Sequence, residues 1–540
     1  MPEKRYAMQN VAAEWGYMSA KAYGDPFNEI ELDIVFTNDS GKTWRVPAYW
    51  AGDNEWRVRF AAPETGVYEY RTVCSDEDNA SLNNIKGTLY VRPYQGNNPL
   101  YQHGPLKISG NKRYFMHQDG TPFFWLGDTW WFGLSKKLKW PEEFQMLTAD
   151  RKQKGFTVIQ LVAGFYPDTP KFEINADKWN DFSWEPGYKR INPAYFDEMD
   201  LRIQWLVRSG IVPCIFGSWG YHIRWTGLEA MKKHWRYVIA RYGAYPVVWC
   251  IAGEGRAPFY LSDNPERDEA IQKHEWSEMG RFIRRIDPYH HPMTIHTRHY
   301  STSREEVDDI SLLDFDLPQA GQGNYSHISD AAKLISEAVL RKPTLPVVNG
   351  EVLYEGTFES CSAEIQRFVF WSAMLSGAAG HTYGANGLWQ FNRKEDMLPA
   401  LPGSASWGEI LWEDAYKFPG SSQVGYGRQL LEKYEWWKLE PRQDYVEPSA
   451  GGDNYALPYA AEIPGKVQIY YFPGPVHPWS PPIFIKGMQH GSKYNAYFYD
   501  PKSGRQYPLG EVEPGSDNRW KLPLPPVMHD WVLVLEKKVY

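Results

Sequence analysis

The sequence predicts an α/β fold in which a (β/α)8 TIM barrel is flanked by N- and C-terminal antiparallel β-sandwich domains, and three observations lead to this prediction. Eight apolar, strand-like segments alternate with helical patterns in the middle of the 540-residue chain. The first and the eighth segment are about 255 residues apart, close to the roughly 250 residues that such a barrel spans. Short strand-like runs without helical patterns fill both ends of the chain.

Residues 1–95 are predicted to form the N-terminal sandwich. Runs such as IELDIVFTN, EWRVRFAA and GVYEYRTV recur at close spacing, and Gly, Asn, Asp and Pro separate them, as is typical of turns. About seven strands are expected, enough for two packed sheets. The segment YQGNNPLYQHGPLKIS that follows is rich in Gly, Asn and Pro and is predicted to be a linker.

Residues 96–440 are predicted to hold the barrel. Apolar residues recur at helical spacing between the strand-like segments, most clearly from Leu228 to Tyr242, and that helix is expected to end at Gly243. The strand-like segments are continuously apolar, as expected of parallel strands that helices cover. They span residues 123–131, 156–164, 211–219, 247–255, 292–300, 312–321, 345–353 and 377–385.

Residues 441–540 return to short strand-like runs. KVQIYYFPG, PIFIKG, YNAYFYDP and WVLVLEK are separated by tight turns, and no helical pattern lies between them. A second small sandwich is therefore predicted at the C-terminal end.

Charge and hydropathy exclude several classes of partner. The net charge of −8 is unlike that of a protein that binds the phosphate backbone of nucleic acid. No run approaches the roughly 18 apolar residues that cross a membrane. The first residues contain no apolar signal-peptide core, so a cytoplasmic location is expected, or a secreted one if a leader was removed. A homo-oligomer is compatible with the sequence.

No cofactor and no metal are expected. The sequence contains no HExxH, no P-loop and no GxSxG motif. The four cysteines are far apart, and the sequence favours reduced, buried thiols over a disulfide or a zinc site. They are Cys74, Cys214, Cys250 and Cys361.

Two glutamates occupy equivalent positions at the ends of predicted strands. Glu254 closes the fourth strand in WCIAGEGR, and Glu351 closes the seventh in PVVNGEVLYEG. They are 97 residues apart, or about 32 per β/α unit over three units, which agrees with the size of such a unit. Active sites of these barrels lie at the carboxyl ends of the strands. A facing pair of carboxylates is the apparatus of glycoside hydrolysis, although either glutamate alone could be one half of a structural ion pair.

Four segments resemble the apiosidase-like glycoside hydrolases of clan A: GTPFFWLGDTWW, DPYHHPMTIH, NGEVLYEG and HTYGANGLW. The resemblance covers nearly the whole chain and implies a barrel between two β-domains. It assigns the acid/base to Glu254 and the nucleophile to Glu351, and thus a retaining mechanism. The expected cytoplasmic location favours oligosaccharides over polymers as substrates. Gly253 departs from the Asn that many clan members have before the acid, so their usual contact with the sugar 2-hydroxyl does not carry over.

Candidate substrate-binding residues lie at or after the ends of the predicted strands. They are Asp128, Trp130, Trp131, Trp219, Tyr221, His222, Arg256, His296, His299, Gln319, His381 and Tyr383.

Several of these residues have a structural interpretation as well. Asp128 could cap the segment that follows it, and one of the two adjacent tryptophans is expected in the core. Arg256 is more typical of a structural ion pair than of a site for an anionic sugar. His296 is the preferred ligand to substrate or nucleophile. Glu355 is a rival nucleophile, but it lies four residues beyond Glu351 and is expected to orient the loop.

Two further functions compete with a glycosidase. A catalytically inactive, carbohydrate-binding barrel or scaffold would bind sugar without turnover. A lyase or isomerase with this fold would need a metal, and a chelator would inactivate it.

Overall fold

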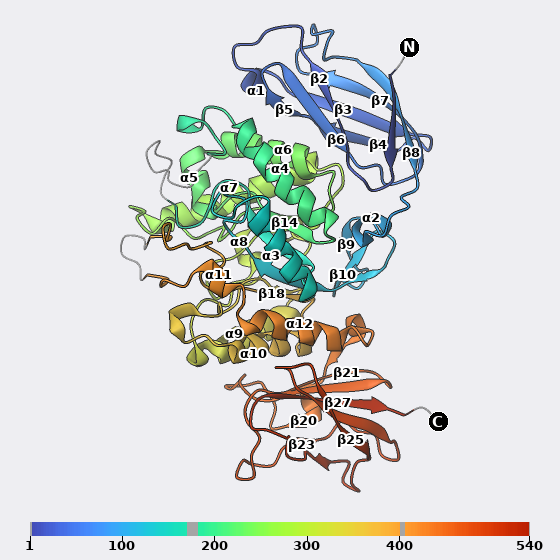
Figure 1. The fold of residues 1–540 in the computed structure, drawn as a ribbon, viewed down its shortest axis with the longest axis vertical. Coiled ribbons are helices and arrows are strands. Elements are labelled where there is room, and N and C mark those ends of the chain that lie inside the picture. Colours follow the sequence, from blue (N-terminus) through green and yellow to red (C-terminus); the bar gives the residue numbers. More distant parts are fainter. Residues whose placement is uncertain (1–2, 170–181, 400–405, 539–540) are drawn as a thin grey trace.

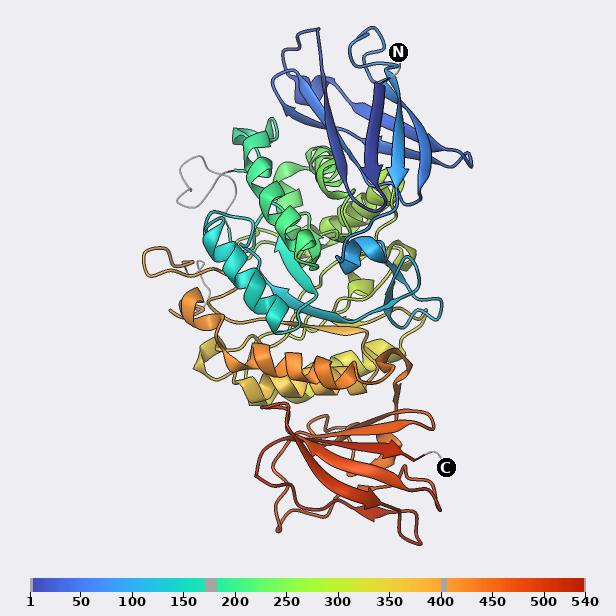
Figure 2. The ribbon, with the colours of Figure 1, turned by 45° about the vertical axis from the view of Figure 1, so that its right-hand side comes forward.

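The computed structural model of the chain describes residues 3–169, 182–399 and 406–538, which are arranged in three parts along the long axis (Figure 1). Two β-sheets lie at the N-terminal end, a parallel sheet with helices lies in the middle, and antiparallel sheets lie at the C-terminal end, as Figure 2 also shows. The fold is therefore mixed α/β.

The two N-terminal sheets pack face to face through aromatic side chains. One has the strand order β1-β8-β7-β3-β4 and the other β2-β6-β5. Phe36 and Phe60, from opposite sheets, are fully buried with ring centroids 3.9 Å apart. Strand β1 runs parallel to β8 and not antiparallel as predicted, since the two strands come from opposite ends of the domain and no hairpin sets their direction. The elements are β1 (Glu3–Met8), β2 (Ala13–Met18), α1 (Pro26–Glu29), β3 (Leu32–Asn38), β4 (Thr43–Pro47), β5 (Tyr49–Gly52), β6 (Glu55–Phe60), β7 (Gly66–Cys74) and β8 (Lys86–Arg92).

The predicted linker is partly structured. It contains helix α2 (Pro99–Gln102), whose first turn is capped by the side chain of Asn98. The chain continues into a small antiparallel sheet of β9 (Leu106–Ile108), β10 (Phe115–His117) and β11 (Pro122–Phe123). Phe115 of this sheet packs on Trp125, the first residue of the first central strand. The small sheet therefore lies at the end where the central strands begin.

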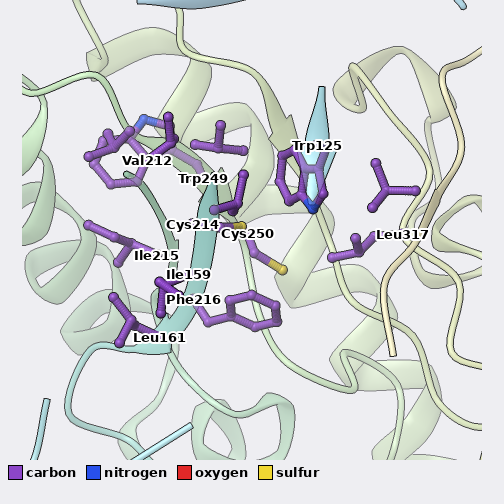
Figure 3. Close-up of a cluster of buried hydrophobic side chains, with 14 of the residues drawn as sticks. Trp125, Ile159, Leu161, Val212, Cys214, Ile215, Phe216, Trp249, Cys250 and Leu317 are labelled. Atoms are coloured by element: carbon purple, nitrogen blue, oxygen red, sulfur yellow. The ribbon is translucent and has the colours of Figure 1, made fainter. Parts of the chain in front are cut away.

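Seven parallel strands form the central sheet, and each lies within one of the eight predicted segments. Their order is β16-β15-β14-β13-β12-β18-β17. Side chains such as Ile159, Cys214 and Trp249 are fully buried in a continuous apolar cluster (Figure 3). The strands are β12 (Trp125–Thr129), β13 (Val158–Val162), β14 (Val212–Phe216), β15 (Val248–Cys250), β16 (Met293–Thr294), β17 (Val348–Asn349) and β18 (Gly380–Tyr383).

The sixth predicted segment, 312–321, is not a regular strand. Asp316 forms a parallel bridge with the residue before β17, and Gln319 forms one with Glu351. A main-chain hydrogen bond also links the start of the segment to β16. The segment therefore lies between β16 and β17. A continuous ladder does not form there because Pro318 has no N–H to donate.

Helices pack around the central sheet (Figure 1). Helix α6 begins at Leu228 and ends at Tyr242, as the pattern predicts, and buries Met231, Trp235 and Val238. The longer helices are α3 (Glu142–Gln153), α4 (Pro193–Arg208), α6 (Leu228–Tyr242), α7 (Pro265–Ile286), α9 (Ile328–Leu340), α10 (Ala363–Leu375) and α12 (Pro419–Leu431); the short ones are α5 (Ile223–Thr226), α8 (Ser303–Glu306) and α11 (Trp412–Ala415).

The C-terminal part is built from two antiparallel sheets, of order β19-β21-β22-β27-β24-β25 and β20-β23-β26. Helix α10 separates the larger sheet from the central one, and its Trp371 stacks on Tyr471. The strands are β19 (Glu440–Pro441), β20 (Val446–Glu447), β21 (Tyr459–Ile463), β22 (Val467–Phe472), β23 (Phe484–Ile485), β24 (Tyr494–Tyr499), β25 (Gln506–Val512), β26 (Trp520–Lys521) and β27 (Trp531–Lys537).

Buried ion pairs join both outer parts to the central one. Arg59 of β6 donates a hydrogen bond of 3.0 Å to Asp200 of α4, which also accepts one of 2.9 Å from Arg241 of α6. Arg367 of α10 donates two hydrogen bonds, of 2.8 and 2.5 Å, to Asp530 before β27. All five side chains are buried, so each charge depends on its partner.

In the described part of the chain, no helix is both long and apolar enough to cross a bilayer. All four cysteines are buried free thiols, which confirms the prediction made from their spacing.

The buried pair between α10 and the C-terminal sheet gives a prediction about stability. Asp530→Ala leaves the Arg367 guanidinium buried without a counter-charge, and we expect it to lower the free energy of unfolding by about 3–5 kcal/mol. The double variant Arg367→Met, Asp530→Leu removes both charges, and its free energy of unfolding should fall clearly less than that of Asp530→Ala. Denaturant unfolding of both variants tests this, and an equal loss in the two would show that the pairing is not the cause.

Candidate active site

Glu254 follows β15 in a turn with unusual backbone geometry. Its φ of 46° is left-handed, a conformation that residues other than glycine rarely adopt. The preceding Gly253 forms a parallel bridge with Trp219, which extends the pairing of β14 and β15 up to the turn. The N–H of Glu254 lies 3.4 Å from His296 Nδ1. Strained residues of this kind persist where their surroundings fix them and are common at functional sites.

Trp219 explains why a glycine precedes Glu254. A Cβ atom at position 253 would lie 2.2 Å from Cε3 of the Trp219 ring, closer than two carbon atoms can approach. An asparagine at position 253 therefore does not fit beside this indole. The departure at Gly253 is therefore the consequence of a tryptophan packed against the turn.

Glu351, after β17, is a buried carboxylate with polar partners. Its side chain is only 7% exposed. Oε1 accepts a hydrogen bond of 3.1 Å from Gln322 Nε2, and Oε2 lies 3.2 Å from His296 Nε2. Burial by itself would raise the pKa of Glu351, but His296, Gln319 and His299 lower it below its usual value. The carboxyl group is therefore ionised at neutral pH.

Gln319 connects the two glutamates. Its main chain forms the parallel bridge with Glu351, and its side-chain Nε2 donates a hydrogen bond of 3.0 Å to Oε1 of Glu254. Gln319 thus lies beside Glu351 in the sheet, and its amide side chain reaches the carboxylate of Glu254. The ends of β15 and β17 are brought together by the segment between β16 and β17.

Both glutamates line one cavity of about 350 Å³, within the roughly 300–1,000 Å³ of small-molecule sites. Much of its wall is aromatic: Trp131 meets Trp219 edge to face with centroids 5.3 Å apart, and Phe358 stacks on Trp407. The lining residues are Trp131, Pro167, Asp168, Trp219, Glu254, Tyr260, His299, Gln319, Gln322, Glu351, Tyr354, Phe358, Trp389 and Trp407. Such walls suit a ligand that carries both hydroxyl groups and apolar C–H faces.

Two other observations direct attention to this cavity. A larger hollow of about 940 Å³ lies beside the C-terminal sheet, but Glu440 is the one carboxylate among its described lining residues. Within the described ranges, no group of three or more His, Cys, Asp or Glu side chains is placed to hold a metal ion. Glu254 and Glu351 both lie in the smaller, aromatic cavity.

The structure brings six of the predicted site residues to the cavity wall: Trp131, Trp219, Glu254, His299, Gln319 and Glu351. His296 is fully buried behind the wall, and its Nε2 lies 3.2 Å from Oε2 of Glu351. These seven residues come from the ends of five strands and from the segment 312–321, so no local sequence pattern places them together.

Besides His296, seven predicted substrate-binding residues are not among the described lining residues of the cavity: Asp128, Trp130, Tyr221, His222, Arg256, His381 and Tyr383. Two of them, Asp128 and Arg256, form buried or partly buried ion pairs, which explains why they do not line the cavity. Asp128 is fully buried 2.5 Å from the Arg151 guanidinium, and its carboxylate also accepts the Trp130 indole N–H. Arg256 pairs with Glu269 at 2.7 Å. These side chains stabilise the central domain and its loops.

The other members of this group are used inside the fold as well. Tyr221 and His222 hydrogen-bond the main chain of residues 166–169. His381 is fully buried beside Asn349. Tyr383 donates its hydroxyl to Glu355, the rival nucleophile, whose carboxylate also accepts the N–H of residue 420 at the start of α12. Glu355 therefore joins its loop to α12 and is not among the described lining residues of the cavity.

Asp168 is a lining residue that sequence reasoning missed. It lies four residues beyond the predicted segment 156–164, in the loop after β13. Burial and the nearby charges of Glu254 and Glu351 raise its pKa to about 7, although a hydrogen bond from Trp407 opposes the shift. A search that included the loops after each strand would have found it. Trp407 has no comparable signal, because it lies far beyond β18.

Comparisons with known proteins identify the family and the fold of the chain. The family of apiosidase-like catalytic domains matches residues 109–438, and a domain of unknown function, DUF5060, matches residues 5–75. A solved glycoside hydrolase is 24% identical with a TM-score of 0.66, over 82% of this chain and 98% of its own. A glycoside hydrolase family 5 protein from Bacteroides vulgatus is 23% identical with a TM-score of 0.66, over 82% and 95%.

A candidate glycoside hydrolase from Bacteroides vulgatus is 19% identical with a TM-score of 0.71, and it covers 98% of this chain and 100% of its own. At these identities the structural likenesses show a shared fold. No curated protein matches the chain.

The contact between Gly253 and Trp219 gives a prediction. Gly253→Ala must displace the indole or the turn, and we expect it to lower the free energy of unfolding by about 1–3 kcal/mol. Gly110→Ala is the matched control, because a Cβ atom there meets open space and its backbone is not left-handed. If denaturant unfolding gave the same stability for both variants, the packing explanation of Gly253 would be wrong.

Proposed function

Because the chain belongs to the apiosidase-like family and is a glycoside hydrolase, we propose that it cleaves a glycosidic bond in oligosaccharides by a retaining double displacement. Glu254 is the acid/base and Glu351 the nucleophile. The observation that carries this proposal is that both carboxylates line one aromatic cavity and that Gln319 contacts Glu254 while its main chain pairs with Glu351.

The two carboxylates have different surroundings, which suits different roles. His296 and Gln322 hold Glu351 as an oriented, ionised group, the state that attacks an anomeric carbon. Glu254 is only half-buried and accepts the hydrogen bond from Gln319. In the first step Glu254 protonates the departing oxygen while Glu351 forms the glycosyl-enzyme. In the second step Glu254 removes a proton from water, the water oxygen attacks the anomeric carbon, and the bond from that carbon to Glu351 breaks, which releases the sugar.

We also propose that the central sheet closes into a (β/α)8 barrel, with residues 312–321 in the position of the sixth strand. The support is the pair of parallel bridges toward β17 and the hydrogen bond toward β16. In a closed barrel Glu254 and Glu351 end the fourth and seventh strands and face the same mouth.

The assignment of the nucleophile predicts the effect of an isosteric change. Glu351→Gln removes the attacking charge, and we expect kcat on aryl glycosides to fall below about a tenth of the wild-type value. Glu359→Gln, at an exposed glutamate in the same loop, is the matched control and should keep full activity. Turnover above that level in Glu351→Gln would refute the assigned role.

The stereochemistry is part of the same test. We expect NMR of the first-formed product to show the anomer of the substrate, as a double displacement requires. If the opposite anomer formed first, the mechanism would be an inverting single displacement and not a retaining double displacement. A barrel that only binds carbohydrate would show no turnover of any glycoside with the wild-type protein.

The contact between His296 and Glu351 predicts a change in pH dependence. His296→Asn removes the group that opposes the effect of burial, so the pKa of Glu351 should rise. Protonated Glu351 cannot attack, and the acidic limb of the kcat/KM profile should therefore move to higher pH, by about one unit or more. His290→Asn, at an exposed position whose left-handed φ suits Asn, is the control. An unchanged acidic limb in His296→Asn would contradict this role.

A further inference from the structure

We infer that Asp168 is a specificity-determining residue, whose carboxyl group binds a hydroxyl group of a neutral sugar and disfavours uronic acids. The inference rests on the proposed function, because it concerns the same cavity. Asp168 is not one of the two catalytic glutamates, and it lies in the loop after β13.

The position of Asp168 is set by its backbone and by one indole. Its φ of 53° is left-handed, which Asp tolerates better than most residues. Trp407 Nε1 lies 3.3 Å from Oδ2 and donates a hydrogen bond to it. The carboxyl group is thus held on the wall of the cavity that Glu254 and Glu351 also line.

Aromatic rings surround this carboxyl group. Trp407 stacks on Phe358 with centroids 6.1 Å apart and meets Trp389 edge to face at 5.7 Å. Tyr260 lines the same cavity, and the charge of Asp168 contributes to the raised pKa of its hydroxyl. A carboxyl group beside aromatic faces matches a sugar ring, which offers hydroxyl donors at its edge and C–H groups on its faces.

The charges around Asp168 favour a neutral ring. Glu254 and Glu351 face it across the cavity, and their charges, after burial, help to raise its pKa to about 7. Below that pH the protonated group can also donate a hydrogen bond, and above it a further negative charge appears. Tyr221, Tyr260 and His299 are the other titratable groups near it.

A sugar carboxylate would meet like charges in this cavity. Glu351 is ionised at neutral pH, and Asp168 adds a second negative charge as the pH rises. The guanidinium groups of Arg256 and Arg298 are both paired with Glu269, and neither residue is among the described lining residues. Repulsion between like charges disfavours an anionic competitor of a neutral substrate.

The test compares pairs of 4-nitrophenyl glycosides of the same anomer that differ only at C6, such as a glucoside and a glucuronide, together with neutral pentosides and hexosides. For the wild type we expect turnover of a neutral glycoside and a preference for it over the matched uronide. Asp168→Ala should raise KM for the neutral glycoside about tenfold or more, because a hydrogen bond to the carboxyl group is lost. The neutral-to-uronide ratio of kcat/KM should fall in this variant.

Asp168→Asn keeps the shape of the side chain, so an effect of this variant on activity reflects the lost carboxyl group and not a folding defect. We expect kcat/KM of the wild type to change across pH 7 and this variant to lack that change, because Asn does not titrate. Asp263→Asn, at an exposed aspartate outside the cavity, is the control and should behave like the wild type.

Two results would overturn the inference alone: an unchanged KM and ratio in Asp168→Ala with Glu351→Gln still inactive, or equal turnover of the matched uronide by the wild type. Activity that survives Glu351→Gln would instead refute the proposed function. No turnover of any neutral glycoside would count against both.

Discussion

The site depends on one constraint, the compensation of a buried negative charge at Glu351. A carboxylate that has left water is costly unless hydrogen bonds or opposite charge replace its hydration. Here Gln322 and His296 approach its two oxygens, and they come from different elements of the central domain. The parallel arrangement, which brings the ends of successive strands to one edge, is what makes this compensation available.

Burial raises the pKa of both acids of the cavity, but their partners act in opposite directions. At Asp168 the like charges of Glu254 and Glu351 add to the effect of burial, and the indole of Trp407 is its one described hydrogen-bond donor. The pKa of Glu351 is lowered although it is buried more deeply, because His296 lies against it. The difference between the two acids is therefore one of partners, not of depth, and it gives the cavity one group that stays ionised and one that titrates near neutrality.

The outer domains are attached through the helices that cover the central sheet. Helices α4 and α6 carry Asp200 and Arg241 toward the N-terminal sheets, and α10 carries Arg367 toward the C-terminal one. Each of these helices also packs its apolar residues against the central domain. The charged contacts cost desolvation but define one arrangement of the three parts, because any other would leave a buried charge unpaired.

The alternation of apolar segments and helical patterns was enough to predict the mixed α/β class, seven strands of the central sheet and the bounds of α6. The rule that chemistry lies at strand ends was enough to select Glu254 and Glu351, which the structure places in one cavity. The same rule selected Asp128 and Arg256, but Asp128 forms an ion pair with Arg151 and Arg256 forms one with Glu269. Those partners are distant in sequence, and no local pattern encodes them.

Sequence reasoning missed Asp168 and Trp407, because they lie in loops whose conformation no hydrophobic periodicity predicts. The sequence by itself therefore determined the order of the elements and the placing of carboxylates at their ends, since both follow from local hydrophobic patterning. Only the tertiary structure decided which of those side chains share one cavity and which are neutralised inside the fold, because that choice depends on loop conformation and on long-range pairing of buried charges.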